Sequence, residues 1–172
     1  MKPVLLLAII LLVDACKVYR RIPENGIAYS KRYNFVFRSV LDVEDYFVNG
    51  RLKRSVAYHA NGNIAIDMRS SGGNSDTMWT VYFHPNGQKM REMLSVFDTL
   101  RWENDWYDDG MQRLSFAHGA NDRQTVRRWH ANGIKSEESE WQGNMRHGKF
   151  IEWDLNGRRI RNEMYRNGVK IK

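Results

Sequence analysis

The sequence predicts an all-β fold, an extended antiparallel array of β-hairpins that forms a single sheet. Seven Asn-Gly pairs and one Asp-Gly pair recur along the 172 residues, at steps of about 12 or 24 residues. The segments between them are short and rich in aromatic and β-branched residues, which is typical of strands. No long stretch has helix caps or a helical period.

The glycines of these dipeptides are predicted to close hairpin turns. Asn-Gly favours two-residue type I′ turns, because Asn tolerates the positive φ that both central residues need and glycine adopts it freely. The regular spacing is lost at residues 70–76 and 97–105, where we expect looser loops. The predicted turn glycines are Gly50, Gly62, Gly87, Gly110, Gly133, Gly157 and Gly168.

An aromatic residue stands four positions before most of these glycines. The six aromatics are Tyr46, Tyr58, Phe83, Trp106, Trp129 and Trp153. Because the position recurs in each repeat, we expect their rings to stack as a structural ladder in the core, each pair contributing roughly 0.5–1 kcal/mol. About twelve strands, spaced about 4.8 Å apart, would form a body about 55–60 Å long.

The N-terminus resembles a bacterial lipoprotein signal. Residues 4–13 (VLLLAIILLV) form an apolar run that is too short to span a bilayer but suits a signal peptide. Cys16, the only cysteine, follows at the expected lipidation position, although Asp14 departs from the pattern. An ordinary cleaved signal and an uncleaved apolar segment are alternatives. With one cysteine, neither an intramolecular disulfide nor a cysteine-based zinc site can form.

The chain is predicted to divide into three parts. These are a signal peptide (1–15), an N-terminal linker with irregular first strands (16–45) and the hairpin repeats (46–172). The formal net charge is +7, with basic residues concentrated in 17–54 and 143–172. A basic segment beside a lipidated Cys16 would attract anionic lipid, although a solvated strand surface is the more ordinary interpretation.

Residues 143–158 (GNMRHGKFIEWDLNGR) resemble the MORN repeat in its bacterial "MORN repeat variant" form, and weaker copies cover 46–172. The resemblance implies an array of β-hairpins. Some bacterial members of that family carry the label of antitoxin component, and eukaryotic relatives are linked to membranes and scaffolding. The resemblance implies no residues that perform chemistry.

Three histidines, His59, His84 and His130, stand three positions before a turn glycine and should share one edge of the array. A histidine row can bind metal, but Tyr107 and Asp154 occupy the equivalent positions and interrupt it. We therefore expect exposed turn residues, no metal site and no cofactor. The remaining histidines are His118 and His147.

Carboxylates cluster in residues 103–109 (ENDWYDD) and 137–140 (EESE), where solvated turn acids are the favoured interpretation. The first cluster lacks the pattern of a calcium loop, and no pair is singled out as a glycosidase pair. A nucleic-acid site needs basic residues beside an exposed aromatic ring, and the best candidates are Arg158, Arg159 and Arg161 near Trp153. An export signal argues against such a partner.

These features predict a non-enzymatic, envelope-associated protein that binds a protein, membrane or cell-wall partner through an extended β surface. We expect a membrane-anchored lipoprotein, with a secreted or periplasmic location as the alternative. The alternative functions are an antitoxin-like partner that neutralises a toxin and, less favoured, a hydrolase acting on polysaccharide. The open ends of the array can also pair with a second copy. The sequence identifies neither the partner nor the oligomeric state.

Overall fold

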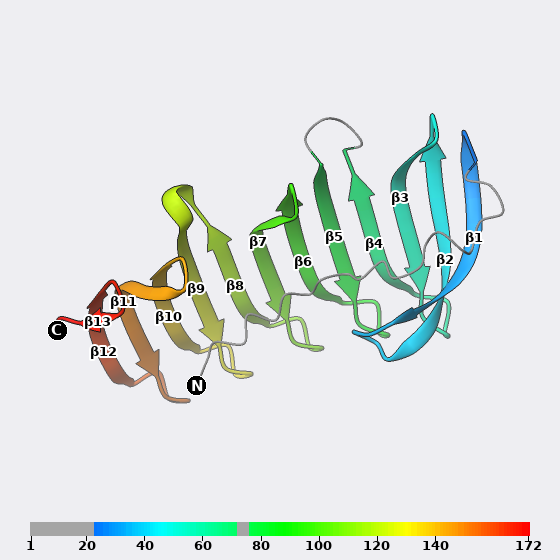
Figure 1. Ribbon diagram of the computed structural model, residues 1–172. Helices are drawn as coiled ribbons and strands as arrows, with labels where there is room; N and C mark the ends of the chain where they lie inside the picture. The colour runs from blue at the N-terminus through cyan, green and yellow to red at the C-terminus, as the bar shows by residue number, and fades with distance from the viewer. Residues whose placement is uncertain (1–22, 72–75) are drawn as a thin grey trace.

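The computed structural model describes residues 23–71 and 76–172 and confirms the predicted fold class. Thirteen strands form one antiparallel sheet in which each strand pairs with the next in chain order (Figure 1). Sequential hairpins therefore build the whole sheet, as the spacing of the turn signals predicts. The predicted signal peptide (1–15) and Cys16 lie outside the described residues.

The strands are short, and a single turn of 3-10 helix (Ala120–Asp122) joins two of them. The strands are β1 (Gly26–Asn34), β2 (Ser39–Val48), β3 (Arg51–Tyr58), β4 (Ile64–Ser70), β5 (Thr77–Phe83), β6 (Lys89–Val96), β7 (Thr99–Trp106), β8 (Gln112–His118), β9 (Arg123–Trp129), β10 (Lys135–Gln142), β11 (Met145–Trp153), β12 (Arg159–Arg166) and β13 (Val169–Lys170).

The predicted boundary between residues 45 and 46 falls inside β2, so the sheet already begins at Gly26. The described part of the predicted linker is thus regular rather than irregular. The physical reason is the period-2 pattern of β2, in which Leu41, Val43 and Phe47 point to one side and are buried. That pattern identifies the strand although no glycine stands in the turn before it.

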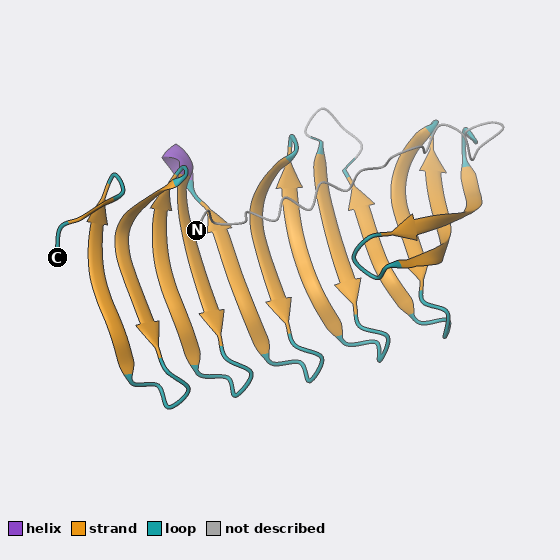
Figure 2. Ribbon diagram, turned by 60° about the horizontal axis from the view of Figure 1, so that its bottom comes forward, coloured by secondary structure: helices purple, strands orange, loops and turns teal. Residues whose placement is uncertain are grey.

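Alternation along the strands gives the sheet two faces. Face A carries the neighbouring residues Met68, Thr80 and Met93, which are all buried. Face B carries the residues between them, such as Val81 and Glu92. The turn that joins β1 to β2 folds back over neighbouring strands (Figures 1 and 2), where the Phe37 ring lies 4.7 Å from that of His59.

The turns on the edge drawn at the top of Figure 1 are the upper turns. Asn49-Gly50 and Asn167-Gly168 have positive φ at both residues, which confirms the type I′ prediction for these two turns. Phe97-Asp98 takes the same conformation with φ values of 48° and 58°, so the looser loop predicted there is wrong. Asp98 supplies the positive φ that glycine provides elsewhere. In the other predicted loop, residues 72–75 lie outside the described residues.

Candidate functional site

Five lower turns, at residues 59–62, 84–87, 107–110, 130–133 and 154–157, share one hydrogen-bond pattern. In the first, the Gly62 N–H donates to the His59 carbonyl (2.9 Å), and the His59 N–H donates to the Asn63 carbonyl (2.8 Å). Only the glycine has positive φ, between 78° and 86° in all five. The type I′ prediction is therefore wrong here: each is a longer turn closed by a glycine bulge.

Asparagine is used in these turns for its side chain. The side-chain oxygen Oδ1 of Asn61 accepts a hydrogen bond from the backbone N–H of Asn63 (3.1 Å). Its side-chain Nδ2 donates to the backbone carbonyl of Pro85 in the next lower turn (2.8 Å). Asn86 and Asn132 repeat both contacts, with the carbonyls of Asp108 and Leu155 as acceptors. Asn is favoured in turns for two reasons: its short side chain hydrogen-bonds to the backbone of its own turn, and it tolerates positive φ. The first reason applies in these lower turns.

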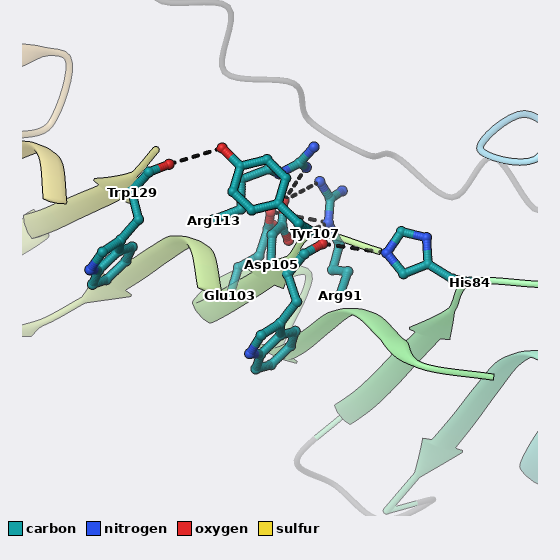
Figure 3. A network of polar contacts seen from close by, with 8 residues as sticks. His84, Arg91, Glu103, Asp105, Tyr107, Arg113 and Trp129 are labelled. Carbon is teal, nitrogen blue, oxygen red and sulfur yellow. Dashed lines mark hydrogen bonds and ion pairs between the residues drawn. The ribbon is translucent and has the colours of Figure 1, made fainter. Parts of the chain in front are cut away.

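The first residue of four lower turns also reaches forward to the end of the next odd-numbered strand. We call these contacts the turn-to-turn bonds. They join His59 to the Phe83 carbonyl (2.9 Å), His84 to that of Trp106 (3.4 Å), Tyr107 to that of Trp129 (2.9 Å) and His130 to that of Trp153 (3.0 Å). Figure 3 shows the bonds of His84 and Tyr107. Because a backbone carbonyl only accepts, each imidazole Nε2 carries a proton in these contacts.

The turn-to-turn bonds correct the interpretation of the histidine row. His59, His84 and His130 are half-buried structural donors rather than exposed turn residues, and Tyr107 takes the same role through its hydroxyl. Among the described residues, no group of three or more histidine and acidic side chains is arranged to hold a metal ion.

Five of the six predicted aromatics end alternate strands and form what we call the aromatic row on face B. They are Tyr58, Phe83, Trp106, Trp129 and Trp153, the last residues of β3, β5, β7, β9 and β11. All five are half-buried, and none belongs to the buried core. Neighbours in the row are two strands, about 9.6 Å, apart, which is too far for ring stacking. The predicted stacked ladder is therefore wrong.

Tyr46 does not belong to the aromatic row. It lies in β2, whose following turn, Asn49-Gly50, is on the upper edge of the sheet. Its hydroxyl donates to Glu44 (2.6 Å), and the Arg54 guanidinium lies 5.8 Å from its ring centroid. All six aromatics stand four positions before a glycine, but Tyr46 precedes an upper turn and the other five precede lower turns.

Each ring is followed by a residue of the next even-numbered strand, from β4 to β12, that pairs with it in register. These residues are Ile64, Lys89, Gln112, Lys135 and Arg159. A bulge next to each pair keeps both members on face B. The aromatic row thus alternates with aliphatic, amide and cationic side chains.

Two of these cations repeat one arrangement. The Lys89 ammonium lies 5.2 Å from the Trp106 ring centroid and 2.7 Å from Glu92. Lys135 lies 5.4 Å from the Trp153 centroid and 2.8 Å from Glu138, whose pKa its hydrogen bond lowers. A cation over a ring contributes about 0.5–1 kcal/mol at such partly exposed sites.

Face A carries an ionic cluster of Arg91, Glu103, Asp105 and Arg113, on the side of the sheet opposite to the Trp129 ring (Figure 3). Asp105 accepts from Arg91 (2.8 Å) and Arg113 (2.7 Å), and Arg91 lies 3.2 Å from Glu103. Asp105 is 1% exposed. The prediction of solvated acids is therefore wrong for Glu103 and Asp105, although Asp108 and Asp109 are exposed.

The two carboxyls of this cluster titrate in opposite directions. Burial raises the pKa of Glu103 to about 7, with Asp105 beside it adding to the effect. Burial also acts to raise the pKa of Asp105, but hydrogen bonds and charge from Arg91 and Arg113 outweigh it and lower that pKa. Both arginines are satisfied by Asp105, so the cluster is a structural ion network.

The second acidic segment, residues 137–140, is half-buried rather than solvated. Glu137 pairs with Arg128 on face A, and Glu138 pairs with Lys135 on face B. Ser139 between them is fully buried and donates to Glu137 (2.7 Å). Alternation along β10 divides the acids between the two faces, so the segment is not one anionic site.

The predicted basic site around Trp153 is also divided. Arg161 is on face A, where it pairs with Glu152 (3.3 Å), whereas Trp153 is on face B. Arg158 and Arg159 are exposed. The structure thus does not bring the three arginines together around the indole.

Two hollows lie at the edges of the sheet. One is lined by Phe37, Ser39, His59, Ala60, Asn61 and Pro85, and the other by Ala117, Gly119, Ala120, Asn121, Arg123, Thr125 and Gln142. Neither has a carboxylate in its lining. The ionic cluster therefore lies outside both hollows, on the open sheet.

A scan against protein-family models finds no match for the chain, and a search of curated proteins finds none either. The resemblance to the MORN repeat variant family therefore stays a prediction from residues 46–172. Within residues 23–71 and 76–172, no helix is both long and apolar enough to cross a membrane.

Proposed function

We propose that this protein is a non-enzymatic, envelope-associated repeat protein that binds its partner through face B. The observation that carries the proposal is the aromatic row, which repeats at a constant step on one face of a single-layer sheet. Half-exposed aromatic rings flanked by polar side chains are typical of binding surfaces.

The architecture leaves this face open to a partner. The main contacts of each described strand are with its neighbours in the sheet. The turn between β1 and β2 folds back and places Phe37 against Tyr82 on face A. Among the described elements, none is packed over the aromatic row of β5 to β11. The exposed part of each ring therefore faces solvent.

The turn-to-turn bonds favour a rigid platform rather than a flexible one. Each fixes the backbone carbonyl of an aromatic residue to the preceding lower turn. A surface whose rings are held in place loses little conformational entropy on binding. Lipidation of Cys16 would hold this platform at the membrane, and the basic residues that follow would add attraction to anionic lipid.

Cell fractionation combined with affinity capture tests the proposal. We expect the full chain in the membrane fraction and Cys16→Ser in the soluble fraction. The double variant Trp106→Ala/Trp129→Ala should stay in the membrane fraction but lose the captured partner. The proposal fails if the wild-type chain is cytosolic, or if the double variant captures the same partner equally well.

The antitoxin-like alternative predicts a different result in the same experiment. A cytosolic chain that co-purifies with the product of a neighbouring gene, and relieves its toxicity, would support neutralisation of a toxin. Hydrolysis of a polysaccharide by the purified chain would support the remaining alternative. Localisation thus separates the first two functions before any partner is identified.

A further inference from the structure

The step of the aromatic row agrees with the repeat of one class of polymer. Neighbouring rings lie two strands apart, at about 9.6 Å. In an extended β-1,4-linked glycan, consecutive sugars are turned over, so the same sugar face recurs once per disaccharide, at nearly this distance. We propose that the aromatic row of face B binds an extended β-1,4-linked glycan chain, with one disaccharide for each step of the row.

This inference rests on the proposed function and names the chemistry of its cell-wall partner. The row runs from Tyr58 in β3 to Trp153 in β11, a length of roughly 38 Å. That length accommodates about eight sugars when two strands are counted for each disaccharide. Figures 1 and 2 show these strands side by side in one continuous sheet, so the row follows the length of the sheet.

Hairpin construction gives every ring the same backbone position. Each aromatic is the last residue of its strand, and a bulge beside each pair keeps ring and partner on face B. The turn-to-turn bonds of His84 and Tyr107 fix the carbonyls of Trp106 and Trp129. The spacing of the rings is therefore set by the backbone rather than by flexible side chains.

The segment between Trp106 and Trp129 is the best-formed subsite. Gln112 lies between the two indoles, in register with Trp106. In the next row of face B, Asn104 pairs with Ser115, and both are half-buried. Indoles pack against the apolar face of a pyranose, while the amide and hydroxyl groups hydrogen-bond its hydroxyls.

Charge favours a glycan over a polyanion such as nucleic acid. Two of the three cations in the row, Lys89 and Lys135, are bonded to the carboxylates of Glu92 and Glu138, and the third, the exposed Arg159, lies at the end of the row next to Trp153. Binding a phosphate backbone needs cations that can neutralise it, and most of its affinity comes from them. Aromatic rings flanked by neutralised cations suit an uncharged polymer better.

Isothermal titration calorimetry with the purified chain and oligosaccharides of defined length tests the proposal. The probes are chitin oligomers of four, six and eight sugars, with maltohexaose, whose α-1,4 linkages curve the chain, as the control ligand. We expect affinity to increase with each added disaccharide up to the octamer, and maltohexaose to bind at least tenfold more weakly than chitohexaose. No binding of the chitin series, or equal binding of maltohexaose, would overturn the proposal.

Substitutions locate the binding on the sheet. Trp106→Ala/Trp129→Ala should weaken chitohexaose binding at least tenfold, while Trp129→Tyr, which keeps a ring, should retain most of it. Trp141→Ala is the matched control, because Trp141 lies near Ser139 on face A. Equal losses in the double variant and the control would contradict the assignment to face B. A chain that captures a protein partner at the membrane but binds no chitin oligomer would refute the glycan while leaving the proposed function intact.

Discussion

From β1 to β5 the sheet has a hydrophobic core, whereas from β8 to β13 it has almost none. Nine of the eleven buried apolar residues in the described chain lie in β1–β5, and only Phe150 lies in β8–β13. In the first region, Leu41, Val43, Ala57 and Ala65 form a buried cluster, with Phe37 packed against it. Ion pairs, cation–ring contacts and turn-to-turn bonds occur in both regions, but in the second they recur with almost no buried apolar side chains beside them.

The difference shows two ways to stabilise one repeated hairpin. Burial of side chains in β1–β5 supplies roughly 1.5–3 kcal/mol for each large apolar residue. In β8–β13, each polar contact contributes only about 0.5–1.5 kcal/mol, but such contacts recur in each repeat. Because each strand depends mainly on its neighbours, we expect the first region to be the more stable part of the array.

The largest expected effect comes from the core of the first region. Leu41→Ala should lower the free energy of unfolding by about 3 kcal/mol, because it leaves a cavity at a residue that is 2% exposed. The measurement is urea-induced unfolding followed by circular dichroism. Leu155→Ala, at a residue that is 61% exposed in a lower turn, is the matched control and should cost less than about 0.5 kcal/mol. Equal losses would remove the distinction between the two regions.

A smaller effect tests the ionic cluster at the junction of the two regions. In the unfolded chain, Glu103 has a pKa of about 4.3, against about 7 in the folded protein. Between these values the folded state binds more protons, so stability falls as pH rises from about 4.3 to 7, by on the order of 2 kcal/mol. Glu103→Gln should abolish this fall and make the protein more stable than wild type at pH 8.

Asp105 has the opposite dependence, which keeps the two effects separate. Its pKa is lowered, so its contribution is lost only as pH falls below about 4. The difference between wild type and Glu103→Gln, measured by denaturant unfolding at pH 5 and pH 8, therefore isolates Glu103. Asp108→Asn, at an exposed carboxyl, is the control and should leave the pH dependence unchanged. If the free energy of unfolding of Glu103→Gln varies with pH in parallel with that of wild type, Glu103 ionises in the folded protein without loss of stability.

The sequence was sufficient for the fold because hairpin signals are local. The spacing of Asn-Gly pairs and the alternating pattern of strands such as β2 predict one antiparallel sheet. The faces were harder to assign, because they depend on register and on the bulge next to each lower turn. Glu103 and Asp105 were placed in solvent for this reason, although alternation along β7 puts both beside Arg91.

The turn-to-turn bonds were missed for a different reason. Their acceptors are backbone carbonyls, which every residue has and no residue type identifies. The only signal was the recurrence of His59, His84 and His130 before an Asn-Gly pair, with Tyr107 in the missing place. We considered the histidine row only as a metal site, although an imidazole N–H and the Tyr107 hydroxyl share the ability to donate a hydrogen bond.

The smallest effect tests those bonds in the second region. Tyr107→Phe removes only the hydroxyl that donates to the Trp129 carbonyl, so unfolding should become easier by about 1 kcal/mol. Tyr107→His installs the donor that three other lower turns use and should restore most of that loss. Tyr29→Phe, at a ring that is 70% exposed, controls for loss of a hydroxyl as such and should change little. If Tyr107→Phe matches Tyr29→Phe, the turn-to-turn bonds contribute nothing measurable, and the second region is held together by its strand pairing, ion pairs and cation–ring contacts.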